Sequence, residues 1–143
     1  MVKSRKLIKP FWIAGVLGLL ASLSACTEGS AQSYRTYSAT EVNTFLKQDT
    51  SAVVLDVRTP DEYASETGHL KNSRLIPVQD LESRIGELKS IKNRTIVAYC
   101  RSGHRSKQAS QIRVKQGFKV VNMDGGITAW NSKGLPIEKG VSQ

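Results

Sequence analysis

The spacing of apolar residues along this chain changes between a helical repeat and short continuous runs. Val42, Phe45 and Leu46 follow the helical repeat, and Ser38 and Glu41 in front of them form a capping box. Continuous apolar runs with β-branched residues predict strands, and a run of four suits a strand buried on both faces. The elements predicted in this way are a helix over residues 39–48, strands over 52–55, 95–99 and 119–121, and a brief extended piece at 75–78.

Helix signals also separate these strands. Thr59 and Glu62 form a second capping box, and Pro60 between them suits the first position of a helix because no N–H is needed there. Strands that alternate with helices predict an α/β domain with a mostly parallel sheet, since parallel neighbours need crossover connections. Three further helical segments are predicted. One has Leu81, Ile85 and Leu88 on one face, and Gly86 weakens this prediction. The others are a helix over 106–116 that Gly117 closes and a helical turn over 127–130.

The first 25 residues follow a different pattern. A basic start precedes an uncharged apolar stretch at 11–23, which is short for a membrane span of about 20 residues. Leu23-Ser24-Ala25-Cys26 then resembles the lipobox of bacterial lipoproteins, in which the cysteine receives the lipid. The alternatives are a plain signal peptide with a free cysteine and an uncleaved anchor. We expect a signal peptide over 1–25, a lipidated Cys26 with a flexible tether over 26–33, and a folded domain over 34–140.

This interpretation implies a location in the bacterial cell envelope, periplasmic or extracytoplasmic, with membrane contact through the lipid anchor. Thr27 follows the lipobox cysteine where, by the resemblance, an aspartate would retain a lipoprotein at the inner membrane. The outer membrane is therefore favoured if the cell has one.

Composition narrows the class of protein. With 143 residues, 39% of them hydrophobic, the chain can form one domain with a core, which excludes collagen-like, disulfide-scaffold and disordered chains. Residues 1–25 hold four of the 21 basic residues, so the remainder carries 17 against 12 acidic residues, or +5. These charges are spread singly, and a nucleic-acid partner is not expected.

Cys100 carries the candidate chemistry. It directly follows the predicted strand 95–99 and precedes a helix, the place where open α/β sheets bind ligands. Backbone N–H groups of residues 101–106, the helix N-terminus, and the charges of Arg101 and Arg105 would all favour the thiolate and hold an oxyanion. The alternative is a buried, inert cysteine, but the sequence RSGHRS after it is too polar for a packed core edge.

Four motifs over roughly residues 34–140 resemble the single-domain rhodanese family, the thiosulfate sulfurtransferase type. They are LDVRTPDEY at 55–63, Gly68-His69-Leu70 with Ile76-Pro77, YCRSGHRS at 99–106, and GGITAW at 125–130 with GLP at 134–136. The chain departs from the family after Leu70, where Lys71-Asn72-Ser73 replaces the usual proline, glycine and alanine. Asn72 can adopt the left-handed conformation that glycine would supply. The resemblance implies a rhodanese-like fold with helices on both faces of the sheet.

The implied reaction is the transfer of a sulfane sulfur from thiosulfate or a similar donor to a thiol or cyanide-type acceptor through a Cys100 persulfide. Four residues separate Cys100 from Arg105, which by the resemblance suits a sulfur atom, whereas related phosphatases and arsenate reductases use a loop one residue longer. No cofactor and no metal are expected, since His69 and His104 have no ligand cluster near them. The alternative is a membrane-tethered binding or persulfide-carrier module without efficient turnover.

Individual roles follow for the site residues. Arg101 and Arg105 are expected to hold the oxyanion end of the donor. The resemblance implies that Asp56 supports the loop from beneath by accepting hydrogen bonds. Arg58 and Glu62 are four residues apart and form either an ion pair or an exposed pair worth well under about 1 kcal/mol. The remaining loop residues are Ser102, Gly103, Ser106 and His104, the last either at the pocket mouth or solvated, and Trp130 is expected in the core.

Overall fold

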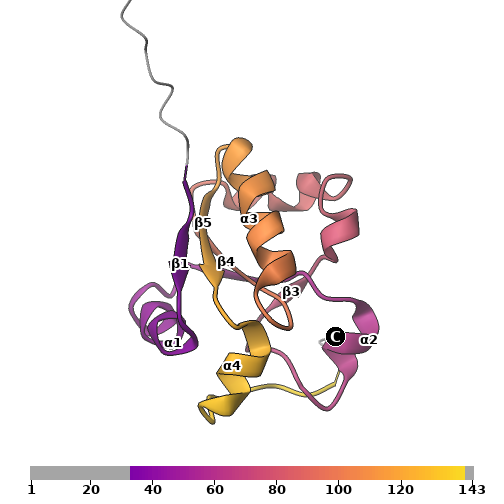
Figure 1. Cartoon of the computed structure of the whole chain (residues 1–143). Helices are drawn as coiled ribbons and strands as arrows, with labels where there is room; N and C mark the ends of the chain where they lie inside the picture. Colours follow the sequence, from indigo (N-terminus) through magenta and orange to yellow (C-terminus); the bar gives the residue numbers. More distant parts are fainter. Residues whose placement is uncertain (1–32, 141–143) are drawn as a thin grey trace, which may run out of the picture.

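The computed structural model describes residues 33–140, which contain one five-stranded sheet and the helices around it (Figure 1). Every pair of neighbouring strands is parallel, in the order β1-β5-β4-β2-β3. The predicted α/β fold with a parallel sheet is confirmed. The strands are β1 (Arg35–Tyr37), β2 (Val53–Asp56), β3 (Arg74–Leu75), β4 (Thr95–Tyr99) and β5 (Lys119–Met123).

Helices cover both faces of this sheet. On one face α1 (Ala39–Gln48) and α4 (Gly126–Ser132) enclose a buried cluster that includes Val97 and Trp130. On the other face α3 (His104–Lys115) and the 3₁₀ helices η1 (Val78–Asp80) and η2 (Ile85–Ile91) enclose a second cluster that includes Ile96. The short helix α2 (Pro60–Ala64) follows β2.

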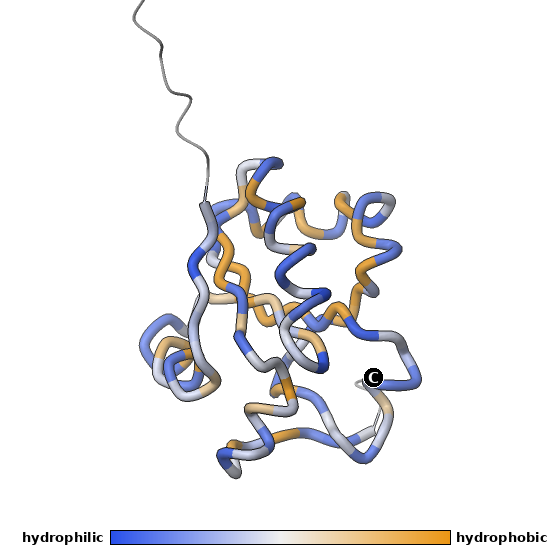
Figure 2. The backbone as a smooth tube through the Cα atoms, viewed as in Figure 1, coloured by the Kyte–Doolittle hydropathy of each residue, from blue (hydrophilic) through white to orange (hydrophobic). Residues whose placement is uncertain are grey.

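Successive residues of β4 point to alternate faces, so the central strand contributes to both clusters. Figure 2 shows the resulting pattern, with hydrophobic segments along the inner strands and hydrophilic segments on the outward turns of the helices. Trp130 is buried in the core, as predicted, and its Nε1–H donates to the Pro136 carbonyl at 3.0 Å. Within residues 33–140 no helix has both the length and the apolar character that a membrane crossing requires.

Both predicted capping boxes are present. The Ser38 hydroxyl accepts from the Glu41 N–H, and the Glu41 carboxylate accepts from the Ser38 N–H at 2.8 Å. Thr59 and Glu62 make the same reciprocal pair around the start of α2, with Pro60 as its first residue. These caps satisfy N–H groups that have no partner inside a helix, and so fix where α1 and α2 begin.

Two predicted elements in the middle of the chain differ from the structure. The predicted helix containing Leu81 and Leu88 consists instead of η1, a turn and η2, because no side-chain cap starts a longer helix and Gly86 weakens it. Leu81 and Leu88 are nevertheless fully buried, as their spacing predicted. The extended piece predicted at 75–78 is the two-residue strand β3, with η1 beginning at Val78.

The edge strand β1 was not predicted, because its three residues Arg-Thr-Tyr are partly or fully exposed and have no apolar run. The last strand, β5, continues two residues beyond the predicted run, through Asn122 and Met123. Asn72 has the expected left-handed backbone, with φ +55°. The proposed signal peptide, the lipidation site Cys26 and most of the tether lie outside the described residues.

Candidate active site

Cys100 lies at the carboxyl end of β4, the central strand, and is 1% exposed. Its Sγ accepts a hydrogen bond from the Gly103 N–H at 3.2 Å, and the Ser106 hydroxyl lies 3.7 Å from the same sulfur. The Ser106 hydroxyl also lies 3.1 Å from the Gly103 carbonyl. Since it has one proton, it donates to either the carbonyl or the sulfur, and a negative charge on sulfur favours the sulfur.

The surroundings of Cys100 favour its ionised form. Burial raises the pKa of the thiol, but hydrogen bonds from the N–H and hydroxyl of Ser106 and from the N–H groups of Ser102 and Gly103 outweigh burial. The pKa of Cys100 is therefore lowered from its ordinary value. A thiolate is the nucleophilic form of cysteine, so the loop prepares the sulfur for attack.

Helix α3 begins at His104, two residues earlier than predicted. Gly103 precedes it with φ +94°, a left-handed conformation that turns the chain straight into the helix. A Cβ at this position would approach the Gly125 nitrogen to 3.1 Å. His104 and Arg105 therefore belong to the first helical turn, whose N–H groups point toward Cys100.

The start of α4 holds the other side of the cysteine loop. The Ile127 N–H donates to the Cys100 carbonyl at 2.8 Å, and the Thr128 N–H donates to the Arg101 carbonyl at 3.1 Å. Gly126 lies against the same carbonyls, and a Cβ on it would come within 2.3 Å of the Cys100 oxygen. The GGITAW motif thus fixes the loop backbone, a role that the sequence did not reveal.

Asp56 and Arg58 form a fully buried ion pair next to the loop, with Nη2 2.6 Å from Oδ2. The other donors of the Arg58 guanidinium reach the carbonyls of Glu62 and Gly68 and the hydroxyl of Thr67. All of its N–H groups therefore have acceptors. The predicted role of Asp56 is corrected accordingly: its carboxylate accepts from the backbone and side chain of Arg58, not from the cysteine loop.

Arg58 and Glu62 form neither the ion pair nor the exposed pair that their spacing left open, because each has another partner. Glu62 is paired with Arg105 through two hydrogen bonds of 2.6 and 2.7 Å, and both side chains are 27% exposed. The two hydrogen bonds from Arg105 lower the pKa of Glu62 to about 2, against the opposing effect of burial. Glu62 in turn raises the pKa of Arg105, as does the nearby Cys100 sulfur. This pair places a fixed positive charge beside the nucleophile.

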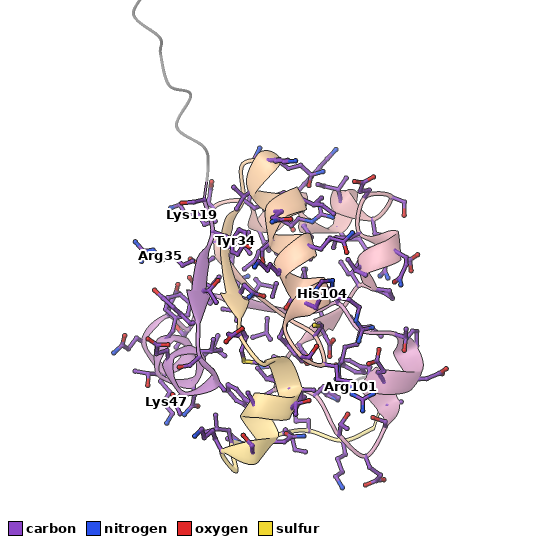
Figure 3. All side chains as sticks on the ribbon, viewed as in Figure 1. Tyr34, Arg35, Lys47, Arg101, His104 and Lys119 are labelled. Atoms are coloured by element: carbon purple, nitrogen blue, oxygen red, sulfur yellow. The ribbon has the colours of Figure 1, made fainter. Side chains whose placement is uncertain are left out.

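Arg101 and His104 are exposed at the mouth of the site (Figure 3). Arg101 lines a hollow of about 300 Å³ together with Arg58, Asp61, Glu62, Ser65 and Thr67. In the part of the chain that the structure describes, no hydrogen bond or ion pair occupies the Arg101 guanidinium. This cation is available to an anionic ligand that enters beside α2.

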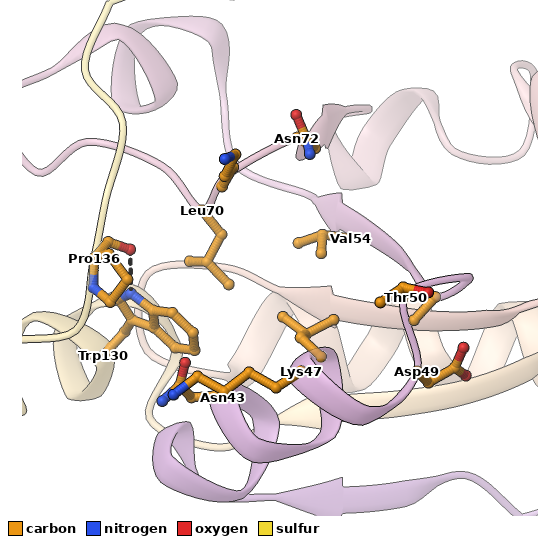
Figure 4. Close-up of a pocket in the computed structure, with 12 residues that line it drawn as sticks. Asn43, Lys47, Asp49, Thr50, Val54, Leu70, Asn72, Trp130 and Pro136 are labelled. Carbon is orange, nitrogen blue, oxygen red and sulfur yellow. Dashed lines mark hydrogen bonds between the residues drawn. The ribbon is translucent and has the colours of Figure 1, made fainter.

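A larger hollow of about 460 Å³ lies between α1 and α4 (Figure 4). Leu70, Val54 and Trp130 line it together with polar residues such as Asn72 and Lys47. Neither cysteine nor histidine contributes to its wall, so it is separate from the nucleophile. Among residues 33–140 no three His, Cys, Asp or Glu side chains come together in a group that could hold a metal ion.

Comparison with known families identifies the domain. The profile of the rhodanese-like domain matches residues 38–133, a range that contains both Cys100 and its supporting residues. The chain belongs to the rhodanese-like domain family. The family membership predicted from the four motifs is confirmed, and so is the fold that the resemblance implied.

Relatives of this rhodanese-like domain include proteins named for sulfur transfer. A "Sulfurtransferase" of Allochromatium vinosum is 43% identical over 91 residues, which are 62% of this chain and 81% of that protein. A mitochondrial protein of Schizosaccharomyces pombe, provisionally named a thiosulfate sulfurtransferase, is 35% identical over 97 residues, 59% of this chain and 67% of that protein. In several other curated relatives the chain spans about half of the length or less.

A solved structure also shows that such a domain folds alone. The crystal structure of a rhodanese-related protein from Thermoplasma volcanium superposes with a TM-score of 0.66 at 30% identity. The match covers 73% of this chain and 98% of that one. That chain is therefore little more than the rhodanese-like domain, and a domain of this extent needs no further segment to fold.

Proposed function

We propose that this rhodanese-like domain is a sulfurtransferase that accepts a sulfane sulfur from thiosulfate or a similar donor as a Cys100 persulfide. The observation that carries the proposal is the hydrogen bonding of Cys100: a buried sulfur whose pKa is lowered by the N–H groups and hydroxyl around it. The sulfurtransferase names of two relatives support the same reaction class.

In the first step, the Cys100 thiolate attacks the outer sulfur of thiosulfate. The bond between the two thiosulfate sulfur atoms breaks, and its electron pair leaves with sulfite. Cys100 becomes a persulfide anion, so the total charge is unchanged. The N–H groups of Ser102, Gly103 and Ser106 that hold the thiolate would also stabilise this terminal sulfur.

Arg101 and Arg105 have different roles in this proposal. Arg105 is held by Glu62 in a fixed orientation and supplies positive charge beside the sulfur. Arg101 is exposed beside the 300 Å³ hollow, so it binds the sulfonate end of the donor and assists the departure of sulfite.

In the second step, a thiophilic acceptor such as cyanide or a thiolate attacks the terminal sulfur of the persulfide. The sulfur–sulfur bond breaks, and its electron pair returns to Cys100 as a thiolate. With cyanide the product is thiocyanate. No proton donor is required, because the leaving group in each step is an anion that the site or the solvent stabilises.

The test uses the domain of residues 27–143, since a related domain of the same extent folds alone. Its intact mass is measured after incubation with thiosulfate, with and without cyanide, beside a Cys100→Ser variant. The expected result is the gain of one sulfur atom that requires Cys100 and is lost with cyanide as thiocyanate forms. Absence of any gain, with thiosulfate and with a polysulfide donor, would contradict the proposal.

The same experiment separates catalysis from simple carriage of sulfur. A carrier that passes sulfur to one protein partner would load Cys100 but release it slowly to cyanide or small thiols. Turnover with cyanide that continues over many cycles therefore supports the enzyme.

We further propose that the domain acts in the bacterial cell envelope, anchored by a lipid on Cys26. The basic start, the apolar stretch at 11–23 and the small residues before Cys26 support this location. Labelling of cells with a radioactive fatty acid, compared with a Cys26→Ala variant, tests it. Incorporation that does not depend on Cys26 would contradict it.

A further inference from the structure

Positive charges gather at the end of the sheet opposite Cys100. A group of cations lies at the amino ends of β1, β4 and β5 or within a few residues before them. We call this group the basic end; it consists of Arg35, Lys92, Arg94, Lys115 and Lys119. All are exposed except Arg94, which is partly buried. Among the described residues none of the five takes part in an ion pair.

Three of these side chains, those of Arg35, Lys119 and Lys92, lie around Phe118. Arg35 and Lys119 line the same hollow of about 340 Å³, which Phe118 also lines. The Lys92 ammonium lies 6.0 Å from the centre of the Phe118 ring. In Figure 3 Arg35 and Lys119 lie together at the top of the domain, far from Arg101.

Acidic residues are distributed in the opposite way. In the described connections that lead into β1, β2, β4 and β5, Asp49 is the one acidic residue, and its carboxylate already accepts from the N–H and hydroxyl of Ser51. At the Cys100 end, acidic residues lie in α2 and in the segments after α2, β5 and α4; they are Asp61, Glu62, Glu66, Asp124 and Glu138. Asp80, Glu82 and Glu87 lie in and between η1 and η2. The basic end is thus a local concentration of positive charge and not the average of the +5 charge of residues 26–143.

The chain also enters the domain at the basic end. Ser33, the first described residue, lines the hollow together with Arg35 and Lys119. Seven peptide units join Ser33 to Cys26, and such a length of chain spans at most about 25 Å. A lipid on Cys26 would therefore keep the basic end close to the membrane. Cys100, about 20 Å from Arg94 along β4, is on the far side.

We infer that the basic end is a docking surface for anionic lipid headgroups, and that the Cys100 site consequently faces away from the membrane. Cations next to a membrane attachment are attracted to anionic lipids, and each adds to the binding. The direction in which the chain leaves the domain favours a lipid surface over a nucleic acid or an acidic protein. The orientation of the Cys100 site rests on the proposed lipid anchor at Cys26. The binding of anionic lipid headgroups depends on the basic end itself.

Binding is measured by cosedimentation of residues 27–143, which lack the apolar stretch, with vesicles of phosphatidylcholine alone or mixed with phosphatidylglycerol. We expect binding to the mixed vesicles that weakens as salt rises, because salt screens the charges. The double variant Arg35→Gln/Lys119→Gln should weaken binding about 20-fold, since each cation near such a surface contributes about fivefold. The matched control Lys71→Gln/Lys133→Gln removes two exposed cations elsewhere and should change binding less than about threefold.

Two results would overturn the inference. One is a failure of the wild-type domain to bind the mixed vesicles more than the neutral ones at low salt. The other is an equal loss of binding in the two double variants, which would show attraction by net charge alone. Circular dichroism of each variant confirms that it is folded. None of these measurements involves sulfur transfer, so they are independent of the proposed enzymatic activity.

Discussion

The residues beneath Cys100 and the residues at its mouth differ in their access to water. Beneath it, Asp56 and Arg58 are at most 1% exposed, and Gly126 is packed against the loop carbonyls. At the mouth, Glu62 and Arg105 are each 27% exposed, and Arg101 is exposed. Each layer contains an arginine paired with a carboxylate, yet the two ion pairs are expected to contribute differently to the free energy of unfolding.

Burial explains this difference. A buried charge that loses its partner cannot be solvated, whereas a partly exposed charge can turn to water. The layer beneath Cys100 should therefore determine whether the domain folds, and the mouth should determine how it handles substrate. Substitutions in the two layers should separate stability from activity.

The largest effect is expected for Arg58→Ala. This change leaves the Asp56 carboxylate buried without its partner and removes the donors to the Glu62 and Gly68 carbonyls. We expect the free energy of unfolding to fall by about 3–5 kcal/mol, measured by urea denaturation. A loss smaller than about 1 kcal/mol would mean that water reaches this layer and that the two layers do not differ in their access to water.

Gly126→Ala should have the next largest effect. The added Cβ would lie 2.3 Å from the Cys100 carbonyl oxygen, at a residue with φ +55°. We expect a loss of about 2–4 kcal/mol and slower alkylation of the Cys100 thiol, because the loop must move. The control is Gly134→Ala, a residue with φ +62° and open space around it, which should lose only about 1 kcal/mol.

At the mouth, Arg101→Ala should raise the KM for thiosulfate about tenfold, since it removes a charge-assisted contact worth about 1.4 kcal/mol or more. Stability should be unchanged within about 0.5 kcal/mol because the side chain is exposed. The control is Lys107→Ala, which removes an exposed cation from α3, the helix that follows the cysteine loop. It should leave the KM unchanged. An equal rise in KM for both variants would show that Arg101 has no specific role.

Of the two ion pairs, the one at the mouth should contribute less to stability, and Glu62→Gln tests it. The pKa of Glu62 is about 2 in the folded protein against 4.5, so its pairing stabilises the fold above about pH 4.5 and the stabilisation is lost as pH falls toward 2. At neutral pH the variant should lose about 1 kcal/mol or less, because the pair is partly exposed. Below pH 4 the difference from the wild type should shrink. A difference that stays constant with pH would exclude this ion pair as its cause.

The sequence predicted the central part of the site better than its surroundings. The apolar run of β4 and Gly117 at the end of α3 are local signals, so they place Cys100 between a strand and a helix without any information on the tertiary structure. Neither alternative for Arg58 and Glu62, an ion pair or an exposed pair, is found, because spacing by four brings side chains together only inside a helix and Arg58 is buried against Asp56. Arg58 precedes the cap residue Thr59 and so lies outside α2. The actual partner of Glu62, Arg105, is 43 residues away in the sequence and is brought close only by the tertiary fold.

The position of β1 in the sheet has a consequence for the order in which the domain folds. Its partner is β5, which begins only at Lys119, so the first strand to be synthesised pairs with the last. Pairing between such distant segments is slow, because the long intervening loop must first be closed. A chain emerging from the ribosome therefore cannot complete its sheet until almost all of it is available. This delay is compatible with the export that we propose, in which the chain crosses a membrane before it folds.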